Sequence, residues 1–313
     1  MRVLLLSHLL AFGGVEQHML NLQGALRRRA HIAHVAGLAV YAEFRQLASW
    51  AGAGDTLSAD DVPLLMSRLN PDVVNIQLPF PAEVAATITR PLVYTAHGVS
   101  SFETPLGVDA AGPVVVMDGR YMEQAKLVAP GEVFHIRNGI NLARFAPQYS
   151  ARRTGRFAYY GRIIPVKTVA ADEVAQHVTV DYHGPGELVE SELVRGHGPC
   201  RPEDVGYSYR IVSATGIAAL EMMACGAILL APAHDDGTFR ALADSSYAVR
   251  PNYGDGHEGR AWEDFMRLAE MSPNQAFSCA AWQRQWVETH HDANDMASRF
   301  LRVYEGEICR VSS

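Results

Sequence analysis

The chain has little cysteine, and the cysteines that it has are not paired in the sequence. Four of them are spread over 313 residues without a C-x-x-C motif: Cys200, Cys225, Cys279 and Cys309. This pattern argues against a structural zinc site and against the disulfide framework of a small secreted protein.

Histidine pairs with a metal-ligating spacing are also lacking. His31 and His34 fall on opposite faces of a predicted strand, and His290 and His291 are neighbours on a predicted helix. Neither pair can easily share one ion. The sequence therefore predicts no metal site, and we expect no cofactor.

No apolar run approaches the roughly 20 residues that a membrane-spanning helix needs. The N-terminal stretch MRVLLLSHLLAFGG resembles a signal peptide at first, but Ser7 and His8 interrupt its apolar run. A glycine loop and a polar helix follow it. We therefore interpret it as a buried first strand and expect a cytoplasmic protein.

Positive charge is not in excess, since the formal net charge is −7. The chain thus has no general attraction for nucleic acid or an anionic membrane. The run Arg27-Arg28-Arg29 is a local exception. Three arginines at the end of a helix favour the negative end of its dipole, and a weak membrane or phosphate contact is the alternative.

Short apolar runs alternate with helical patterns in the first half of the chain. The run RVLLLS (2–7) is typical of a strand buried on both faces. Residues 13–29 place apolar side chains on one helix face: Val15, Met19, Leu22 and Leu26. Further strands are expected at 31–39, 72–78, 91–98, 113–119 and 133–140, and helices near 60–69 and 119–128. Such alternation predicts a parallel sheet with right-handed crossovers.

The same pattern restarts after a polar, basic and turn-rich linker at 141–156. Strands are expected at 157–163, 178–184, 207–214 and 227–232, and helices at 166–177 and from Gly216 onward. The tail is helical, with Trp282, Trp286, Phe300 and Tyr304 as expected anchors. The predicted fold class is α/β, with two doubly wound, Rossmann-like domains that face each other across a cleft. We expect an N-terminal domain at 1–150, a C-terminal domain at 151–285 and a last helix, 286–313, packed on the N-terminal domain.

Ligands of open parallel sheets bind at the carboxyl ends of the strands. Gly13 and Gly14 follow the first strand and open a helix, so their amides could approach an anion; a tight turn is the alternative. The full G-x-G-x-x-G dinucleotide pattern is absent. His97 ends a buried strand beside Gly98, where a neutral imidazole can donate a hydrogen bond to a sugar hydroxyl or to developing charge.

Two further groups follow strands of the second half. Arg162 and Lys167 come after Gly161 and could clamp a diphosphate, or form a solvated surface pair. In the stretch ATGIAALEMMACG, a helix that begins near Gly216 exposes amides for phosphates, and Glu221 could accept hydrogen bonds from the two hydroxyls of a ribose. The alternative is that Glu221 binds an arginine or lysine of the protein.

These segments resemble a known family in content and order. LEMMACGAILLAP is similar to the donor-binding helix of retaining GT-B glycosyltransferases, above all glycosyltransferase family 4 (glycosyl transferases group 1). GGVEQHMLNL, TAHG, IRNGINLARFAP and YYGRIIPVK fall in that family's order. The resemblance implies a GT-B fold with a nucleotide-sugar donor bound mainly by the C-terminal domain and an acceptor bound mainly by the N-terminal one.

The resemblance also assigns roles to residues. His97 would contact the donor sugar, Arg162 and Lys167 would neutralise the diphosphate, and these three form the expected catalytic set. The expected donor-binding residues are Gly13, Gly14, Asn138, Gly161, Ser213, Thr215, Gly216, Ile217 and Glu221. Glu16 and His8 are the expected acceptor contacts. Asp235 and Asp236 are weaker candidates for sugar contacts, and the loop 99–112 is expected to set acceptor specificity.

The sequence departs from the family at one position of the E-x7-E pattern. Ser213 stands eight residues before Glu221, where the family has a glutamate that contacts the transferred sugar. The C-terminal domain is also short, since about 60 residues separate GRIIPVK from Glu221. Both features raise the alternative of a weakened or inactive sugar-nucleotide-binding protein.

The expected reaction is transfer of a sugar from a UDP- or GDP-linked donor with retention of anomeric configuration. No D-x-D motif is present, and no carboxylate is an obvious nucleophile. We therefore expect a metal-independent reaction in which the leaving phosphate assists attack on the same face. A sugar-nucleotide epimerase of the same architecture is a further alternative. The acceptor, whether a glycan, a lipid, a small molecule or a modified polymer, has no signature in the sequence.

Overall fold

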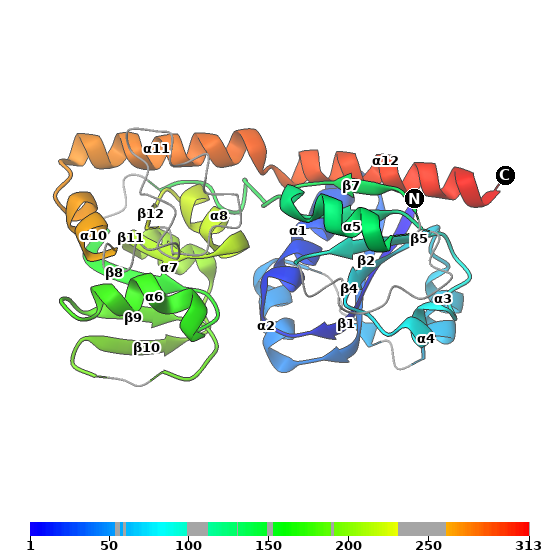
Figure 1. Cartoon of the computed structure of the whole chain (residues 1–313), viewed down its shortest axis with the longest axis horizontal. Helices are drawn as coiled ribbons and strands as arrows, with labels where there is room; N and C mark the ends of the chain where they lie inside the picture. The colour runs from blue at the N-terminus through cyan, green and yellow to red at the C-terminus, as the bar shows by residue number, and fades with distance from the viewer. Residues whose placement is uncertain are drawn as a thin grey trace. The chain divides into compact units, whose positions relative to one another are not determined.

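The computed structural model describes residues 1–53, 57–58, 61–98, 112–129, 131–148, 153–188, 191–230 and 261–312. The chain divides into two compact units (Figure 1). Unit 1 comprises Met1–Asn141 and Asp292–Ser313, and unit 2 comprises Leu142–His291. These boundaries lie nine and six residues from those predicted, because the residues that follow Asn141 already bind side chains of unit 2.

Unit 1 is built on seven parallel strands in the order β3-β2-β1-β4-β5-β6-β7. The strands are β1 (Arg2–Leu10), β2 (Ile32–Val40), β3 (Leu57–Ser58), β4 (Val73–Leu78), β5 (Leu92–Ala96), β6 (Val114–Val116) and β7 (Val133–His135). Every residue of β4 is buried, Asn75 and Gln77 included, as in a strand covered on both faces. The strand order reverses between β1 and β4, which is where sheets of this kind bind ligands.

Helices cover unit 1 and include the C-terminal helix of the chain (Figure 1). They are α1 (Gly14–Arg28), α2 (Ala42–Trp50), α3 (Val62–Leu69), α4 (Ala82–Ala85), the 3-10 helix η2 (Gly119–Tyr121), α5 (Met122–Val128) and α12 (Ala293–Ser312). Phe300 and Tyr304 of α12 are fully buried in one apolar cluster with Met19 and Leu22 of α1. Two of the four predicted anchors of the tail thus hold α12 against unit 1, whereas Trp282 and Trp286 lie in unit 2.

The arginine run at the end of α1 is engaged within unit 1. Arg27 donates hydrogen bonds to the Ala33 carbonyl, Arg28 to the Asn294 side chain, and Arg29 to Asn294 and Ser298. The bonds of Arg28 and Arg29 tie α1 to the first turns of α12, and those of Arg27 tie it to β2, which gives the run a structural role.

Unit 2 is built on five parallel strands in the order β10-β9-β8-β11-β12. The strands are β8 (Thr154–Tyr160), β9 (Val180–His183), β10 (Val194–Gly198), β11 (Tyr209–Ala214) and β12 (Ile228–Leu230). Its helices are α6 (Pro165–Val174), α7 (Pro202–Ser208), α8 (Gly216–Ala224), α10 (Ala261–Ala269) and α11 (Pro273–His290). The predicted Rossmann-like C-terminal domain is therefore present, on a sheet of five strands against seven in unit 1.

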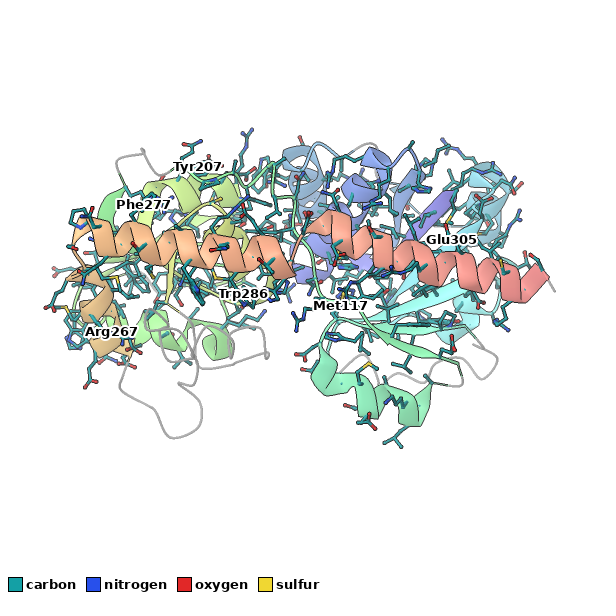
Figure 2. All side chains as sticks on the ribbon, turned by 90° about the horizontal axis from the view of Figure 1, so that it is seen from above. Met117, Tyr207, Arg267, Phe277, Trp286 and Glu305 are labelled. Atoms are coloured by element: carbon teal, nitrogen blue, oxygen red, sulfur yellow. The ribbon has the colours of Figure 1, made fainter. Side chains whose placement is uncertain are left out.

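The helical tail is divided into two helices. Ser272 and Gln275 form a capping box that starts α11, and α11 ends at His290. The Ala293 amide donates to the Ile140 carbonyl, so the first residue of α12 is bound to unit 1. Trp286 of α11 (Figure 2) stacks on His290 and meets His291 at a tilt, with ring centroids 5.2 and 4.8 Å apart. Within the described ranges, no helix combines the length and apolarity needed to cross a membrane.

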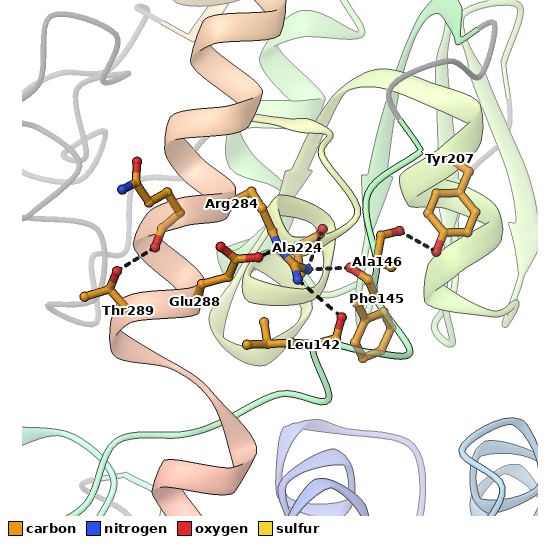
Figure 3. Close-up of polar contacts among 9 residues, drawn as sticks. Leu142, Phe145, Ala146, Tyr207, Ala224, Arg284, Glu288 and Thr289 are labelled. Atoms are coloured by element: carbon orange, nitrogen blue, oxygen red, sulfur yellow. Dashed lines mark hydrogen bonds and ion pairs between the residues drawn. The ribbon is translucent and has the colours of Figure 1, made fainter.

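Arg284 of α11 holds the start of unit 2 against α8 (Figure 3). Its Nη1 donates to the Phe145 and Ala224 carbonyls at 2.6 and 2.9 Å, and its Nη2 donates to the Leu142 carbonyl at 3.3 Å. Glu288 accepts from Nε at 2.6 Å. Arg284 is 7% exposed, so an arginine fork here satisfies carbonyl groups that water does not reach.

Arg284→Lys is expected to destabilise unit 2 by about 2 kcal/mol, because a lysine ammonium cannot reach three carbonyls at the geometry of a guanidinium fork. Urea unfolding measures the effect. Arg267→Lys is the matched control, since Arg267 is half-exposed in its pair with Asp264. That variant should stay within about 0.5 kcal/mol of the wild type, and an equal loss in both variants would contradict the role of the fork.

Candidate functional site

Two loops of unit 2 leave its sheet side by side at the point where the strand order reverses. Ala214 of β11 pairs with Tyr160 of β8. Thr215 and Gly161 follow these two residues directly, so both loops begin at the same edge of the sheet. The sheet topology thus brings together the two predicted donor-binding segments of unit 2.

Gly216, the first residue of α8, has a backbone conformation that favours glycine. Its φ is +57°, and no described heavy atom lies within 4 Å of the place that a Cβ would take. A side chain is therefore disfavoured there by the backbone, not by crowding. Thr215 is the N-cap of α8, but its side chain makes no capping hydrogen bond.

Gly216→Ala should cost about 1–2 kcal/mol of stability, because alanine is strained in the left-handed region. Gly14→Ala is the matched variant, since Gly14 also opens a helix, has room for a Cβ and has no positive φ. It should leave stability unchanged or slightly raised. Urea unfolding of both variants tests the difference, and an equal cost at the two positions would refute it.

Glu221 is a buried carboxyl group on α8. It is 2% exposed, and its Oε1 has no hydrogen-bond partner among the described residues. Burial raises the pKa of Glu221 to about 8, although the charge of Arg144 lowers it and that of Glu203 raises it. Burial and the charge of Glu221 in turn raise the pKa of Tyr160 well above its usual value. A buried oxygen without a partner is costly, so this site favours a bound hydrogen-bond donor.

Arg144 and Glu203 are neighbours of Glu221 that sequence reasoning missed. The Arg144 Nε and Nη2 atoms donate to the two carboxylate oxygens of Glu203 at 2.5 and 3.0 Å. Both side chains are largely buried. Glu203 lies in the first turn of α7, a helix that the sequence analysis did not predict. The pair is separated by 59 residues, and no local pattern in the sequence signals it.

Ser213, which stands at the position of the family's first glutamate, is fully buried in β11. Its hydroxyl has no hydrogen-bond partner among the described residues. Ile217 is also buried, on the first turn of α8. The structure therefore places Ser213 and Glu221 in one unit, each with a buried polar atom that is left without a described partner.

The basic loop after β8 is shaped by two glycines. Gly161 has a φ of +145°, and a Cβ on Gly184 would lie 1.8 Å from the Gly161 carbonyl oxygen. The Tyr159 hydroxyl donates to the Arg162 carbonyl at 2.8 Å. Arg162 is exposed and Lys167, in the first turn of α6, is half-buried. The close approach of Gly184 is a constraint that the sequence analysis did not identify.

In unit 1, His97 is in contact with a second histidine that the sequence analysis did not single out. The ring of His18, on α1, meets that of His97 edge-on, with centroids 5.0 Å apart. His18 Nδ1 lies 3.0 Å from Asn138 Oδ1, and His97 Nε2 lies 2.8 Å from Gln77 Oε1. Burial lowers the pKa of His18 to about 4, and burial and His18 lower that of His97 well below its usual value. Both rings are therefore neutral at pH 7.

The other predicted residues of unit 1 lie at or near the end of β1. Glu16 is buried, and its Oε1 accepts from the Ala11 amide at 3.0 Å, so this side chain shapes the loop that contains Gly13. Gly14 is exposed at the start of α1. His8 is exposed within β1, because the strand continues three residues beyond its predicted end.

A groove of about 1070 Å³ lies elsewhere in unit 1, between β7 and α12. Its lining includes Phe134, Val303, Arg299, Arg302 and Arg310, and none of the predicted site residues. The predicted sugar contacts Asp235 and Asp236, and all of the loop 99–112 except Gly112, lie outside the described residues. Within the described part of the chain, no three His, Cys, Asp or Glu side chains are arranged to hold a metal ion.

No protein-family model matches the sequence, and no curated protein matches it either. Several solved structures match nearly the whole chain. HepE from Anabaena, in complex with UDP and glucose, has a TM-score of 0.75 at 15% identity, over 98% of this chain and 100% of that one. TarM from S. aureus, as a mutant in complex with Fondaparinux, alpha-GlcNAc-glycerol and UDP, has a TM-score of 0.73 at 9% identity, over 97% and 100%.

A third similar structure is an alpha-glucosyltransferase in complex with UDP and a 13-mer DNA that contains an HMU base. Its TM-score is 0.69 at 11% identity, over 97% of this chain and 99% of that one. At such identities the likeness concerns the fold. The chain therefore has the GT-B fold, in which two Rossmann-like units are each built on a parallel sheet.

Proposed function

We propose that this protein is a glycosyltransferase that moves a sugar from a nucleoside diphosphate sugar, UDP- or GDP-linked, to an acceptor. The observation that carries the proposal is Glu221, whose buried carboxyl group keeps one oxygen without a described partner where the strand order of unit 2 reverses. Solved structures with the same fold contain UDP or UDP-glucose, among them those of HepE and TarM. The family resemblance of the sequence motifs points in the same direction.

In the proposed donor site, Glu221 accepts hydrogen bonds from the two ribose hydroxyls. Arg162 and Lys167 neutralise the diphosphate together with amides at the start of α8, among them those of Gly216 and Ile217. Gly161, Ser213 and Thr215 complete the part of the site that lies in unit 2. In unit 1, Gly13, Gly14 and Asn138 are proposed donor contacts, His97 contacts the sugar, and Glu16 and His8 contact the acceptor.

The proposed chemistry is transfer with retention and without a metal ion. The leaving diphosphate gains negative charge, which Arg162, Lys167 and a helix N-terminus can stabilise. In the proposed donor site the carboxylate of Glu221 is assigned to the ribose, and no described residue is proposed as a nucleophile toward the sugar. Attack on the same face, assisted by the leaving phosphate, fits this set better than a double displacement.

An inactive sugar-nucleotide-binding protein is the second candidate, and Ser213 is the observation that favours it. The serine hydroxyl lacks the charge and reach of the glutamate found at this position in the resembled family. A sugar-nucleotide epimerase needs acid and base carboxylates beside the sugar, and Ser213 supplies neither.

We also propose that the protein acts in the cytoplasm. None of its four cysteines forms a disulfide, as expected in a reducing compartment.

Hydrolysis of UDP-glucose in the absence of an acceptor tests the reaction. Because the acceptor is unknown, water takes its place, and proton NMR follows the anomer of glucose that appears first. The α anomer is expected from the α-linked donor, with and without EDTA. First appearance of the β anomer would contradict retention, and loss of turnover in EDTA would contradict metal independence. Binding without turnover would favour the inactive protein.

A further inference from the structure

A chain of buried amide and hydroxyl groups leads to His97 through unit 1. Gln77 and Asn75, on one face of β4, and Thr95 on β5 are each at most 1% exposed, as is Tyr304 of α12. Gln77 Nε2 donates to Asn75 Oδ1 at 3.0 Å, and the Thr95 hydroxyl donates to the same oxygen at 2.8 Å. Asn75 Nδ2 donates to the Tyr304 hydroxyl at 2.7 Å.

The direction of these bonds determines what Gln77 can offer to His97. Since the Asn75 oxygen accepts from Gln77, the amide nitrogen of Gln77 points to Asn75 and its oxygen points to His97. An amide oxygen can only accept a hydrogen bond. The His97 Nε2 atom, 2.8 Å away, must therefore carry a proton.

We propose that Gln77 is a positioning residue that holds the imidazole of His97 with its proton on Nε2, so that Nδ1 carries the lone pair and can only accept hydrogen bonds. The tautomer follows from the orientation of the Gln77 and Asn75 amides in the buried network. The consequence for sugar binding rests on the proposed function: a sugar hydroxyl donates to His97, and His97 does not donate to the sugar. This reverses the role that the sequence analysis expected of His97.

The ring of His18, next to His97, is also held in one neutral tautomer. Its Nδ1 faces the side-chain oxygen of Asn138, so its proton lies on Nδ1. Its Nε2 is buried without a partner among the described residues. The two histidines thus hold opposite tautomers 5.0 Å apart. Charging either ring beside the other in this buried place is unfavourable.

Tyr304 extends the network to a helix that is remote in the sequence. The phenol oxygen is the acceptor that orients the Asn75 amide, and 229 residues separate the two side chains. The proton position on His97 therefore depends on the docking of α12 against the sheet. Tyr304→Phe removes this acceptor and should weaken the preference for Nε2–H without touching Gln77.

Nitrogen-15 NMR of protein labelled at histidine tests the proposal on the full chain without a ligand. The His97 signals are assigned by their loss in His97→Gln. In the wild type, Nε2 should be protonated and Nδ1 unprotonated. Gln77→Leu should lose this preference, because leucine offers no acceptor to His97. Thr95→Val is the matched control, since it removes a buried bond to Asn75 but leaves Gln77 facing His97.

A wild-type signal with the proton on Nδ1 would overturn the proposal, even if Gln77→Leu fails to fold. An unchanged tautomer in a folded Gln77→Leu protein would also overturn it. Hydrolysis of UDP-glucose is the second readout: Gln77→Leu should lower kcat about tenfold, while Thr95→Val stays within about twofold. If the tautomer is as expected but no variant or wild type turns over a donor, the proposed function fails and the positioning role of Gln77 stands.

Discussion

Replacing Glu221 with glutamine is expected to raise the free energy of unfolding of unit 2 by about 5 kcal/mol above pH 8. The reason is the buried carboxyl group of α8, whose pKa burial raises from 4.5 to about 8. Between these two pH values the unfolded chain releases the proton while the folded protein retains it. Ionisation of the unfolded chain therefore lowers its free energy relative to that of the folded protein.

The sign of the effect is set by the direction of the pKa shift. Below pH 4.5 the carboxyl group is protonated in both states and has no influence on stability. As the pH rises toward 8, the wild type loses about 1.4 kcal/mol per pH unit relative to the variant, and the loss then levels off. Glutamine has nearly the same shape and does not titrate, so Glu221→Gln should lack this decline.

Urea unfolding at pH 5, 7 and 9 measures the difference. Glu270→Gln is the control, because Glu270 is exposed at the end of α10, and this variant should follow the wild type at every pH. A constant difference in the free energy of unfolding between Glu221→Gln and the wild type from pH 5 to pH 9 would contradict the raised pKa of Glu221.

The sequence predicts much of the fold because the central strands are short and mostly apolar. β4 was predicted at 72–78 and lies at Val73–Leu78, and β2 was predicted at 31–39 and lies at Ile32–Val40. Strand β10, whose sequence is VRGHG, was missed because it lies at a sheet edge with few buried side chains. Helix α7 was missed because its seven residues include a glycine and only one full turn of apolar spacing.

The candidate site was only partly predictable, because its supporting contacts are distant in the sequence. Glycine turns and Glu221 stand out in the sequence since they break local patterns. His18 does not stand out, because its partners Asn138 and His97 lie on other elements. Arg144 with Glu203, and Gln77 with His97, are likewise joined only by the folded chain. Local patterns thus indicate where the candidate site lies, and long-range packing sets the chemistry of the side chains there.

Donor binding is expected to depend strongly on pH. If the ionised carboxylate of Glu221 accepts from the ribose hydroxyls, then donor binding must remove the proton held at a pKa of about 8. The dissociation constant of UDP-glucose should therefore be about 100-fold higher at pH 6 than above pH 8. UDP-glucose suits this test because its diphosphate does not titrate in this range.

Isothermal titration of UDP-glucose at pH 6 and pH 9 is the measurement that tests the account most directly. GDP-, ADP- and TDP-glucose at pH 9 serve as the comparison of bases, and Glu221→Gln serves as the matched variant. A donor site at Glu221 predicts binding that tightens with pH in the wild type and weaker, pH-independent binding in Glu221→Gln. Binding to the wild type that is equal at both pH values, or no binding of any of the four donors, would contradict a donor site at Glu221.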